Sequence, residues 1–526
     1  MKTMKLSYKR TIFVGFAFFL ICLFWQAYDT IIPKILTDKF GMSQTGSGFI
    51  MALDNILALF MLPLFGNISD KCKSKYGRRT PFIVVGTILA VILLFTMTFA
   101  DAAQLKQVAD VAPTNENAQQ ILYDADLTIK TPAGKTVVVK EEFTREEFVS
   151  IPMTLHDGSA NPEYSSYVIP ARQAYASTVT KANNGPLVFF IVVLLLLLIA
   201  MATFRSPAVA LMPDVTLKPL RSKANSIINL MGALGGIVVL ILGMVFGTGK
   251  SMNALMSYQT YFTICCIIML VALGLFLWQV REPKFVAEME AQSAELGLDT
   301  DVEEDYEEIM READEKAAEA GVAAPVRKKT LTADEKKSLY LILASVILWF
   351  FGYNAITSKY SVYASSVLGL DYAMTLTIAS AAAIVAYIPA GIVASKIGRR
   401  KTILAGVVLL TASFLFASFM TAGSSPILMN IFFVTAGIGW ATNNVNSNPM
   451  VVELATGDEV GKYTGFYYTA SMAAQTVTPI FSGFLMDHLG MRILFPYGAL
   501  FVAAAFVTML FVRHGDAKLL DTKPAK

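Results

Sequence analysis

The sequence predicts an all-α membrane protein in which twelve transmembrane helices form two six-helix bundles. Of its 526 residues, 55% are hydrophobic and 16% are charged, and the charges gather in a few short stretches. The apolar stretches between them reach about 20 residues, the length that crosses a bilayer. A basic segment at 66–79 stands between two such stretches and recurs in shorter form at 391–401. This repetition indicates a duplicated chain with both basic segments on the same side of the membrane.

Twelve apolar segments, six on each side of a polar linker, support this fold class. They lie at 11–36, 45–66, 81–100, 187–212, 224–247, 257–280, 338–358, 371–394, 402–421, 426–447, 464–485 and 493–512. The predicted domains are an N-terminal segment at 1–10, a bundle at 11–280, a linker at 281–337, a second bundle at 338–513 and a tail at 514–526. The first segment is too long for a signal peptide and lacks its cleavage site, so we expect it to remain as a helix.

Lysines and arginines predict the orientation, because they are enriched in cytoplasmic loops. Four of them precede the first segment, at Lys2, Lys5, Lys9 and Arg10. Others follow the second, fourth and eighth segments, at Lys71, Lys73, Lys75, Arg78, Arg79, Lys218, Arg221, Lys223, Lys396, Arg399, Arg400 and Lys401. The other short loops hold only scattered bases such as Lys34 and Lys359. We therefore expect a multi-pass protein of the plasma membrane with both termini and the linker in the cytoplasm.

A polar insertion at 101–183 separates the third and fourth segments on the predicted outer side. Its residues 131–134 (TPAG) lie between two short runs typical of strands, which predicts a β-hairpin. We expect a small β-rich cap over the entrance; an insertion without a role in transport is the alternative. In the linker, an acidic run at 303–308 indicates a solvated connector, and Thr332 with Glu335 predicts a capping box at the start of the seventh helix.

Several classes of function find no support in the sequence. The net charge of +3 does not favour nucleic acid as a partner. Phosphate loops, zinc-ligand spacings and nucleophile elbows are missing, so we expect no enzyme, no metal and no cofactor. The histidines are scattered outside the apolar segments, and the cysteines encode no disulfide framework: His156, His488, His514, Cys22, Cys72, Cys265 and Cys266.

Two segments carry a resemblance to a known family. Residues 66–83 (GNISDKCKSKYGRRTPFI) resemble the loop between the second and third helices of the major facilitator superfamily. Within that superfamily, the sequence of this segment is similar to that of the glycoside–pentoside–hexuronide:cation symporters and the sucrose/proton symporters. Residues 205–214 (RSPAVALMPD) and 221–225 (RSKAN) resemble the link between the fourth and fifth helices of the sucrose carriers. The resemblance implies a secondary active transporter that imports a sugar or glycoside, expected to be a disaccharide.

The coupling cation is predicted from two buried acids and from a departure from the family. Asp29 and Asp54 lie at similar depth in the first two helices, where carboxylates are costly and mark functional sites; Asp29 near the outer interface is the alternative. Sodium-coupled melibiose-type carriers bear two aspartates in the second helix, at positions that match Ala58 and Leu62 here. We therefore predict that Asp54, supported by Asp29, couples transport to protons rather than sodium.

Sugar sites combine aromatic faces with amide and charged groups. Such mixtures occur in the first, second, fourth, seventh and tenth helices. The predicted substrate-binding residues are Trp25, Gln26, Asn55, Arg205, Trp349, Tyr353, Asn354, Trp440, Asn443, Asn444 and Asn446. For Arg205, pairing with an acid of the second helix or extending to the surface are alternatives.

The two basic segments supply the predicted gate. Asp70 ends a helix beside two arginines and is expected to form a latch at the cytoplasmic mouth; arginines that only fix topology are the alternative. Asp214 and Glu453 follow equivalent helices in the two halves. The predicted gating residues are Gly66, Asp70, Gly77, Arg78, Arg79, Arg399 and Arg400.

Two other functions remain open at this point. One is a proton-coupled exporter of amphipathic compounds, and the other is a sugar sensor of the same fold that does not transport. The expected partners are a small sugar, a coupling cation and the lipid bilayer, around a monomer.

Overall fold

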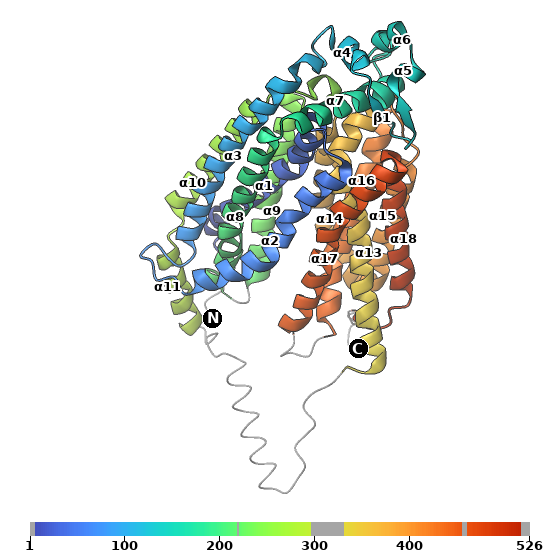
Figure 1. The fold of residues 1–526 in the computed structure, drawn as a ribbon. Coiled ribbons are helices and arrows are strands. Elements are labelled where there is room, and N and C mark those ends of the chain that lie inside the picture. Colours follow the sequence, from blue (N-terminus) through green and yellow to red (C-terminus); the bar gives the residue numbers. More distant parts are fainter. Residues whose placement is uncertain (1–5, 218–219, 296–330, 455–459, 517–526) are drawn as a thin grey trace.

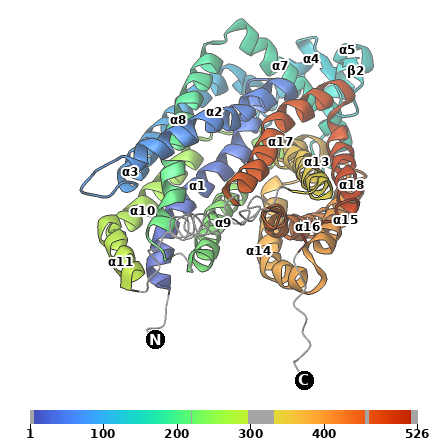
Figure 2. The same ribbon diagram turned by 90° about the horizontal axis from the view of Figure 1, so that it is seen from below.

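The structure is a computed structural model that describes residues 6–217, 220–295, 331–454 and 460–516. Long helices run side by side in two groups, which Figure 2 shows from the end opposite the insertion: blue to green for the first half and yellow to red for the second. The first group holds α1 (Tyr8–Lys34), α2 (Gln44–Asp70), α3 (Thr80–Val108), α8 (Gly185–Asp214), α9 (Arg221–Phe246) and α10 (Gln259–Gln279). The second holds α13 (Ala333–Tyr363), α14 (Tyr372–Ile397), α15 (Arg399–Ala417), α16 (Pro426–Val452), α17 (Val460–Leu489) and α18 (Leu494–Leu510).

A helix stands at each of the twelve predicted positions, and the helical fold class is confirmed. In the part of the chain that the structure describes, nine helices are long and apolar enough to cross a membrane. In α14 the apolar stretch is shorter, at Tyr372–Tyr387. Helices suit a bilayer because every backbone hydrogen bond is made within the segment. The chain is therefore a multi-pass membrane protein, while a membrane-crossing role for all twelve helices stays a prediction.

The duplication extends to local detail. The first helix of each half runs into a π-helical turn, Ile35–Lys39 after α1 and Ala364–Leu368 after α13. These turns lengthen both helices beyond their predicted ends. The predicted capping box begins α13: the N–H of Glu335 donates to Thr332 Oγ1 (3.2 Å), and the N–H of Thr332 donates to the Glu335 carboxylate (2.9 Å). The linker starts as α11 (Glu282–Glu295), and its acidic run at 303–308 lies outside the described residues.

The insertion forms a small folded unit at one end of the bundles (Figure 1). Its hairpin is confirmed, with β1 (Thr128–Lys130) antiparallel to β2 (Thr136–Val138). The expectation of a β-rich cap is wrong beyond this hairpin, because most of the insertion is helical. The remaining elements are a 3-10 turn (Ala109–Val111), α4 (Ala118–Asp124), α5 (Val139–Glu142), α6 (Arg145–Ser150), a π-helical turn (Tyr164–Val168) and α7 (Ile169–Ala182).

A capping box at the start of α6 marks one of these helices in the sequence. Thr144 Oγ1 accepts from the N–H of Glu147, and the Glu147 carboxylate accepts from the N–H of Thr144. Hydrogen bonds to its carboxylate lower the pKa of Glu147, and the bond from the Thr144 hydroxyl has a larger effect than the bond from the Thr144 N–H. The unit has its own hydrophobic core, which includes Leu122, Phe148 and Val168. It is therefore built as a packed domain rather than as an extended loop.

The two halves meet at the insertion end. Lys34 Nζ of α1 donates to Ser365 Oγ (2.8 Å), and Lys359 Nζ of α13 donates to the carbonyl oxygen of Gln44 (2.7 Å). The Asp487 carboxylate of α17 accepts from the N–H groups of Gln44 (2.8 Å) and Thr45 (2.7 Å), which caps the start of α2. Between described residues, every hydrogen bond that joins the halves lies at this end, so this end is closed (Figure 1).

The packed insertion gives a first prediction. Phe148 is fully buried in the insertion core, and its neighbour Val149 is 37% exposed. Phe148→Ala is expected to destabilise the insertion by about 3–5 kcal/mol, because it removes a large buried ring. Hydrogen exchange of the amides in α4 and α6 measures this loss, with Val149→Ala as the control. Unchanged exchange in Phe148→Ala would contradict a packed core.

Candidate functional site

A polar cavity of about 160 Å³ lies inside the molecule between the two halves. The first half contributes α1, α2 and α8, and the second contributes α13 and α17. Six of the predicted site residues line this cavity: Trp25, Asp29, Asp54, Asn55, Arg205 and Asn354. The structure thus brings together residues that are up to 329 positions apart, from Trp25 to Asn354.

The cavity holds two carboxyl groups and one guanidinium group. The Asp54 carboxylate accepts a hydrogen bond from Asn55 Nδ2 (2.8 Å). The guanidinium of Arg205 lies over the Trp25 ring, 5.2 Å from its centroid, and its charge acts on both Asp54 and Asp29. Arg205 therefore points into the bundle instead of extending to the surface, and Asp29 shares the cavity with Asp54.

The second half lines the cavity with uncharged polar groups. Thr357 and Ser358 stand one turn after Asn354 on α13, and Gln475 comes from α17. None of these three residues is among the predicted site residues. The signal that finds the first two is helical spacing, since residues three and four positions apart share a face.

The other predicted substrate-binding residues do not line this cavity. Trp349 is fully buried. Tyr353 and Trp440 stack on each other, with ring centroids 3.7 Å apart and planes at 6°. Gln26 lies beside Gly236 of α9, where an added Cβ would meet its Oε1 at 3.5 Å.

The amides of α16 have three different surroundings. Asn443 is fully buried and lies against Gly406 of α15, whose added Cβ would approach Asn443 Oδ1 to 2.3 Å. Asn446 Nδ2 donates to the carbonyl oxygen of Thr442 in its own helix (2.8 Å), and Asn444 is half-buried. The amides thus do not share one cavity, because successive helical residues point in different directions.

A second cluster of charges lies at the end opposite the insertion. Arg79 forms ion pairs with Asp70 and Asp214, and Arg78 pairs with Asp214 (2.8 Å). Burial lowers the pKa of Arg79, but its bonds with Asp214 and Asp70 hold that pKa above the ordinary value. Asp70, Arg78 and Arg79 therefore have defined partners, while their role as a gate stays a prediction. No described residue of the second half joins this cluster, so the Asp70 latch lies within one half.

An acid that the sequence analysis missed organises the same cluster. The Glu282 carboxylate at the start of α11 accepts from the N–H groups of Arg78 (2.8 Å), Arg79 (2.9 Å) and Thr80 (2.7 Å). It thereby caps the start of α3, where unpaired N–H groups favour negative charge. Gly77 has φ +106°, and a Cβ there would meet the Glu282 carboxyl carbon at 2.2 Å. Glycine is required at this position by both the backbone and the close approach.

The second half repeats this arrangement. Arg399 pairs with Glu453 (3.0 Å), as Arg78 and Arg79 pair with Asp214. The Asp516 carboxylate accepts from the N–H of Arg399 (2.5 Å) beside Gly398, which has φ +94°. Arg400 Nη2 donates to the carbonyl oxygen of Leu510 (2.5 Å). In each half, an acid after the sixth helix caps the start of the third.

Comparisons with known proteins agree with this architecture. A model of the Major Facilitator Superfamily matches residues 174–388 and 371–526, and a model described as MFS/sugar transport protein matches residues 13–109. The first covers more than half of the chain. The chain therefore belongs to the major facilitator superfamily, which places it among transporters rather than enzymes.

Individual relatives match over shorter stretches. The sucrose transport protein SUC3 of Arabidopsis thaliana is 41% identical over 70 residues, which are 13% of this chain and 11% of SUC3. The uncharacterized symporter YnaJ of Bacillus subtilis is 30% identical over 87 residues, which are 16% of this chain and 19% of YnaJ. The chain thus matches less than a fifth of either relative, and these matches confirm the predicted resemblance to symporters of this superfamily.

The solved structures support the fold. The inward open conformation of the xylose transporter XylE from E. coli superposes with a TM-score of 0.54 at 13% identity, over 97% of both chains. At this identity the likeness defines the arrangement of helices and nothing about the substrate.

The Glu282 cap gives a second prediction. Glu282→Gln removes the negative charge that three N–H groups share, and it is expected to lower stability by about 1–3 kcal/mol. Glu290→Gln, on the exposed face of the same helix, is the matched control. Thermal unfolding in detergent measures both. Equal melting temperatures for the two variants would rule out a stabilising cap.

Proposed function

We propose that the protein imports a sugar or glycoside, preferably a disaccharide, together with a proton, by alternating access. The observation that carries this proposal is the polar cavity between the halves, in which two carboxyl groups face one guanidinium. A site at the junction of two repeats is the arrangement that secondary transporters use. The similarity to a sucrose transport protein supports sugar as the substrate class.

Charge balance supports the proton as the coupling ion. The cavity holds Asp29, Asp54 and Arg205, so with both acids ionised it carries one net negative charge. One proton makes the cavity neutral. A neutral cavity is less costly to close off from water than one that carries an uncompensated charge. Asp54 is the proposed carrier of this proton, and Asp29 supports it as a second carboxylate in the same cavity, whose charge also acts on Arg205.

The neighbouring groups suit a sugar. Trp25 offers an aromatic face, and Asn55, Asn354 and Gln475 offer amides for hydroxyl groups. The cavity is smaller than the roughly 300 Å³ at the low end of ligand pockets. A disaccharide therefore requires the halves to move apart around the site, as alternating access demands. An exporter of amphipathic compounds would need a more apolar cavity, which makes that alternative weaker.

The orientation is part of the proposal. With the arginine clusters and both termini in the cytoplasm, the insertion lies outside, and the structure is closed on the outer side. This corresponds to an inward-facing state of a monomer in the plasma membrane. Opening the outer side requires release of the contacts that Lys34, Lys359 and Asp487 make across the halves.

A third prediction tests the function directly. Vesicles that contain the protein are given labelled mono- and disaccharides under imposed pH or sodium gradients. We expect accumulation of one sugar under an inward proton gradient. Asp54→Asn should lose this accumulation by more than about tenfold while sugar exchange across the membrane continues, because the variant still binds but no longer carries a proton.

Asp334→Asn, an exposed acid at the start of α13, is the matched control and should behave as the parent protein. Uptake of no sugar under either gradient would overturn the proposed function. Normal accumulation in Asp54→Asn would instead move the coupling role to Asp29.

A fourth prediction tests alternating access. At the outer end, a Cβ added to Gly243 of α9 would lie 3.3 Å from the Cβ of Ala373 of α14. This separation is near the range that a disulfide spans. The pair Gly243→Cys and Ala373→Cys, in a chain whose native cysteines are replaced by serine, is expected to block uptake when oxidised and to recover on reduction.

The two single variants are the controls, because neither can join the halves. A gel-shift assay measures how much of the disulfide has formed. Full uptake by the cross-linked protein would show that the outer end need not open.

A further inference from the structure

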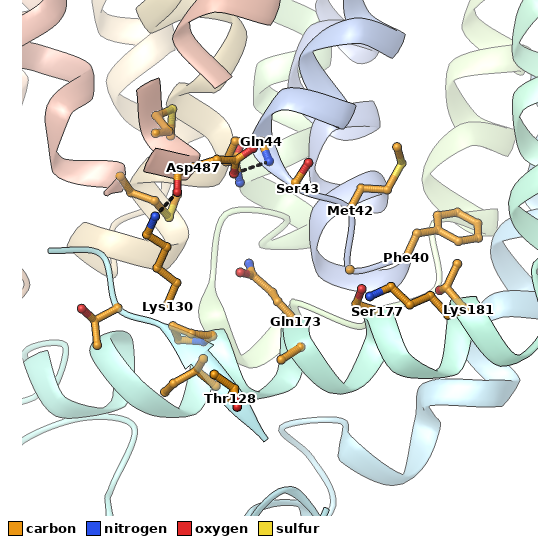
Figure 3. Close-up of a pocket in the computed structure, with 18 of the residues that line it drawn as sticks. Phe40, Met42, Ser43, Gln44, Thr128, Lys130, Gln173, Ser177, Lys181 and Asp487 are labelled. Atoms are coloured by element: carbon orange, nitrogen blue, oxygen red, sulfur yellow. Dashed lines mark hydrogen bonds between the residues drawn. The ribbon is translucent and has the colours of Figure 1, made fainter. Parts of the chain in front are cut away.

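A larger cavity, of about 540 Å³, lies at the outer end, apart from the central site. Its walls come from the insertion and from both halves. Figure 3 shows Thr128, Lys130 and Gln173 of the insertion on one side, with Gln44 and Asp487 on the other. Neither the family motifs nor the central site gives this cavity a role.

The insertion reaches the second half through its hairpin and so fixes one wall. The N–H of Arg492 donates to the carbonyl oxygen of Pro132 (3.1 Å), and the Lys130 ammonium donates to the carbonyl oxygen of Asp487. Gly134 and Gly490 approach so closely that a Cβ on Gly490 would lie 2.5 Å from the Gly134 nitrogen. The hairpin therefore sits on the loop between α17 and α18 without an intervening side chain.

The cavity offers polar groups that the protein itself does not use. Gln44 is 7% exposed, and its Oε1 has no hydrogen-bond partner among the described residues. A buried acceptor without a partner is unfavourable, and a ligand hydroxyl would satisfy it. Ser177 and Thr128 add hydroxyl groups at the wall, and Gln173 adds an amide whose Nε2 is held by Asp38 (2.9 Å).

The charges at the cavity favour an uncharged ligand. The Asp487 carboxylate is engaged by the N–H groups of Gln44 and Thr45, and the Lys130 ammonium by a carbonyl oxygen. The third charged residue of the lining, Lys181, is exposed, so its ammonium can be hydrated. Hydroxyl and amide groups alternate with apolar surface from Pro170, Met486 and Met491. This mixture suits a molecule with many hydroxyl groups and an apolar ring face, and the volume lies within the usual range for ligands.

We propose that this outer cavity is a second binding site, for a neutral molecule of the sugar class. The class of ligand rests on the proposed function. Because the walls belong to both halves, the site is complete only while the outer end is closed. A ligand there binds this arrangement more tightly than the open one and shifts the protein toward it. External sugar at high concentration therefore slows its own import.

Protection of an introduced cysteine tests the site. Ser177→Cys is made in the full chain with the native cysteines replaced by serine, in nanodiscs, and its rate of alkylation by a polar maleimide is measured. The probe ligand is sucrose, or the disaccharide that the uptake assay selects. At a sugar concentration about ten times the dissociation constant, about one site in ten is unoccupied. The alkylation rate is proportional to this fraction, so it is expected to fall about tenfold.

Three comparisons make the result specific. Thr178→Cys is the next residue of α7, is exposed and does not line the cavity, so its rate should not change. Glycine betaine at equal concentration controls for osmotic effects and should not protect. Adding Gln44→Leu should abolish protection of Ser177→Cys, whereas adding Asn354→Ala at the central site should leave it intact.

The outcomes separate this proposal from the proposed function. Protection that survives Asn354→Ala but not Gln44→Leu supports the outer site. Protection lost in Asn354→Ala means that the central site acts at a distance, and it overturns the outer site. A sugar that is transported but does not protect Ser177→Cys also overturns it and leaves the proposed function standing. A protein that neither transports nor is protected overturns both.

Discussion

The free energy of placing a charge inside a bilayer constrains where this chain carries its ionisable side chains. Two sets of these groups in the described helices illustrate the constraint. Lys34 pairs with Asp38 (3.1 Å) and Lys39 with Asp101 (2.5 Å), all nearly or fully buried at the insertion end of the first half. Asp29, Asp54 and Arg205 line the central cavity instead. Since an unpaired charge in lipid is expensive, both arrangements keep charge away from the lipid-facing surface.

The same constraint allows the halves to separate at one end. Lys34 and Lys359 are buried where the halves meet, and each takes a hydrogen bond partner from the other half. The opening that alternating access requires would remove these partners from the other half, and it would also admit water. The ammonium groups therefore exchange a protein partner for hydration and not for lipid. Because hydration would replace the lost hydrogen bonds of Lys34 and Lys359, breaking these contacts would cost less free energy than moving the two ammonium groups into lipid.

The sequence predicts most of the helices and the centre of the site, because both depend on local signals. A run of apolar residues defines a helix in lipid, and an acid within such a run stands out, as Asp54 does. Which face of a helix meets a cavity depends on the neighbouring helices. This is why Asn443, chosen for its amide, lies against Gly406, and why Thr357 went unnoticed. The predicted seventh segment ends at 358, before Lys359, because polar residues interrupt the apolar stretch there, whereas α13 continues to Tyr363.

The two halves share the structure of their helix ends, but they differ in the residues that line the central cavity. Glu282 and Asp516 cap the third helix of their halves in the same way, so the two repeats keep equivalent end structures. At the central cavity the halves differ: the first supplies all the charged groups, and the second supplies Asn354 and Gln475. A ligand that bridges the halves therefore joins a charged wall to a neutral one. Alternating access, as proposed, would change the distance between these walls while Asp54 and Arg205 stay together in the first half. In the function proposed here, protonation and substrate binding would be linked through the ligand itself, which would touch both walls, without a path through the rest of the protein.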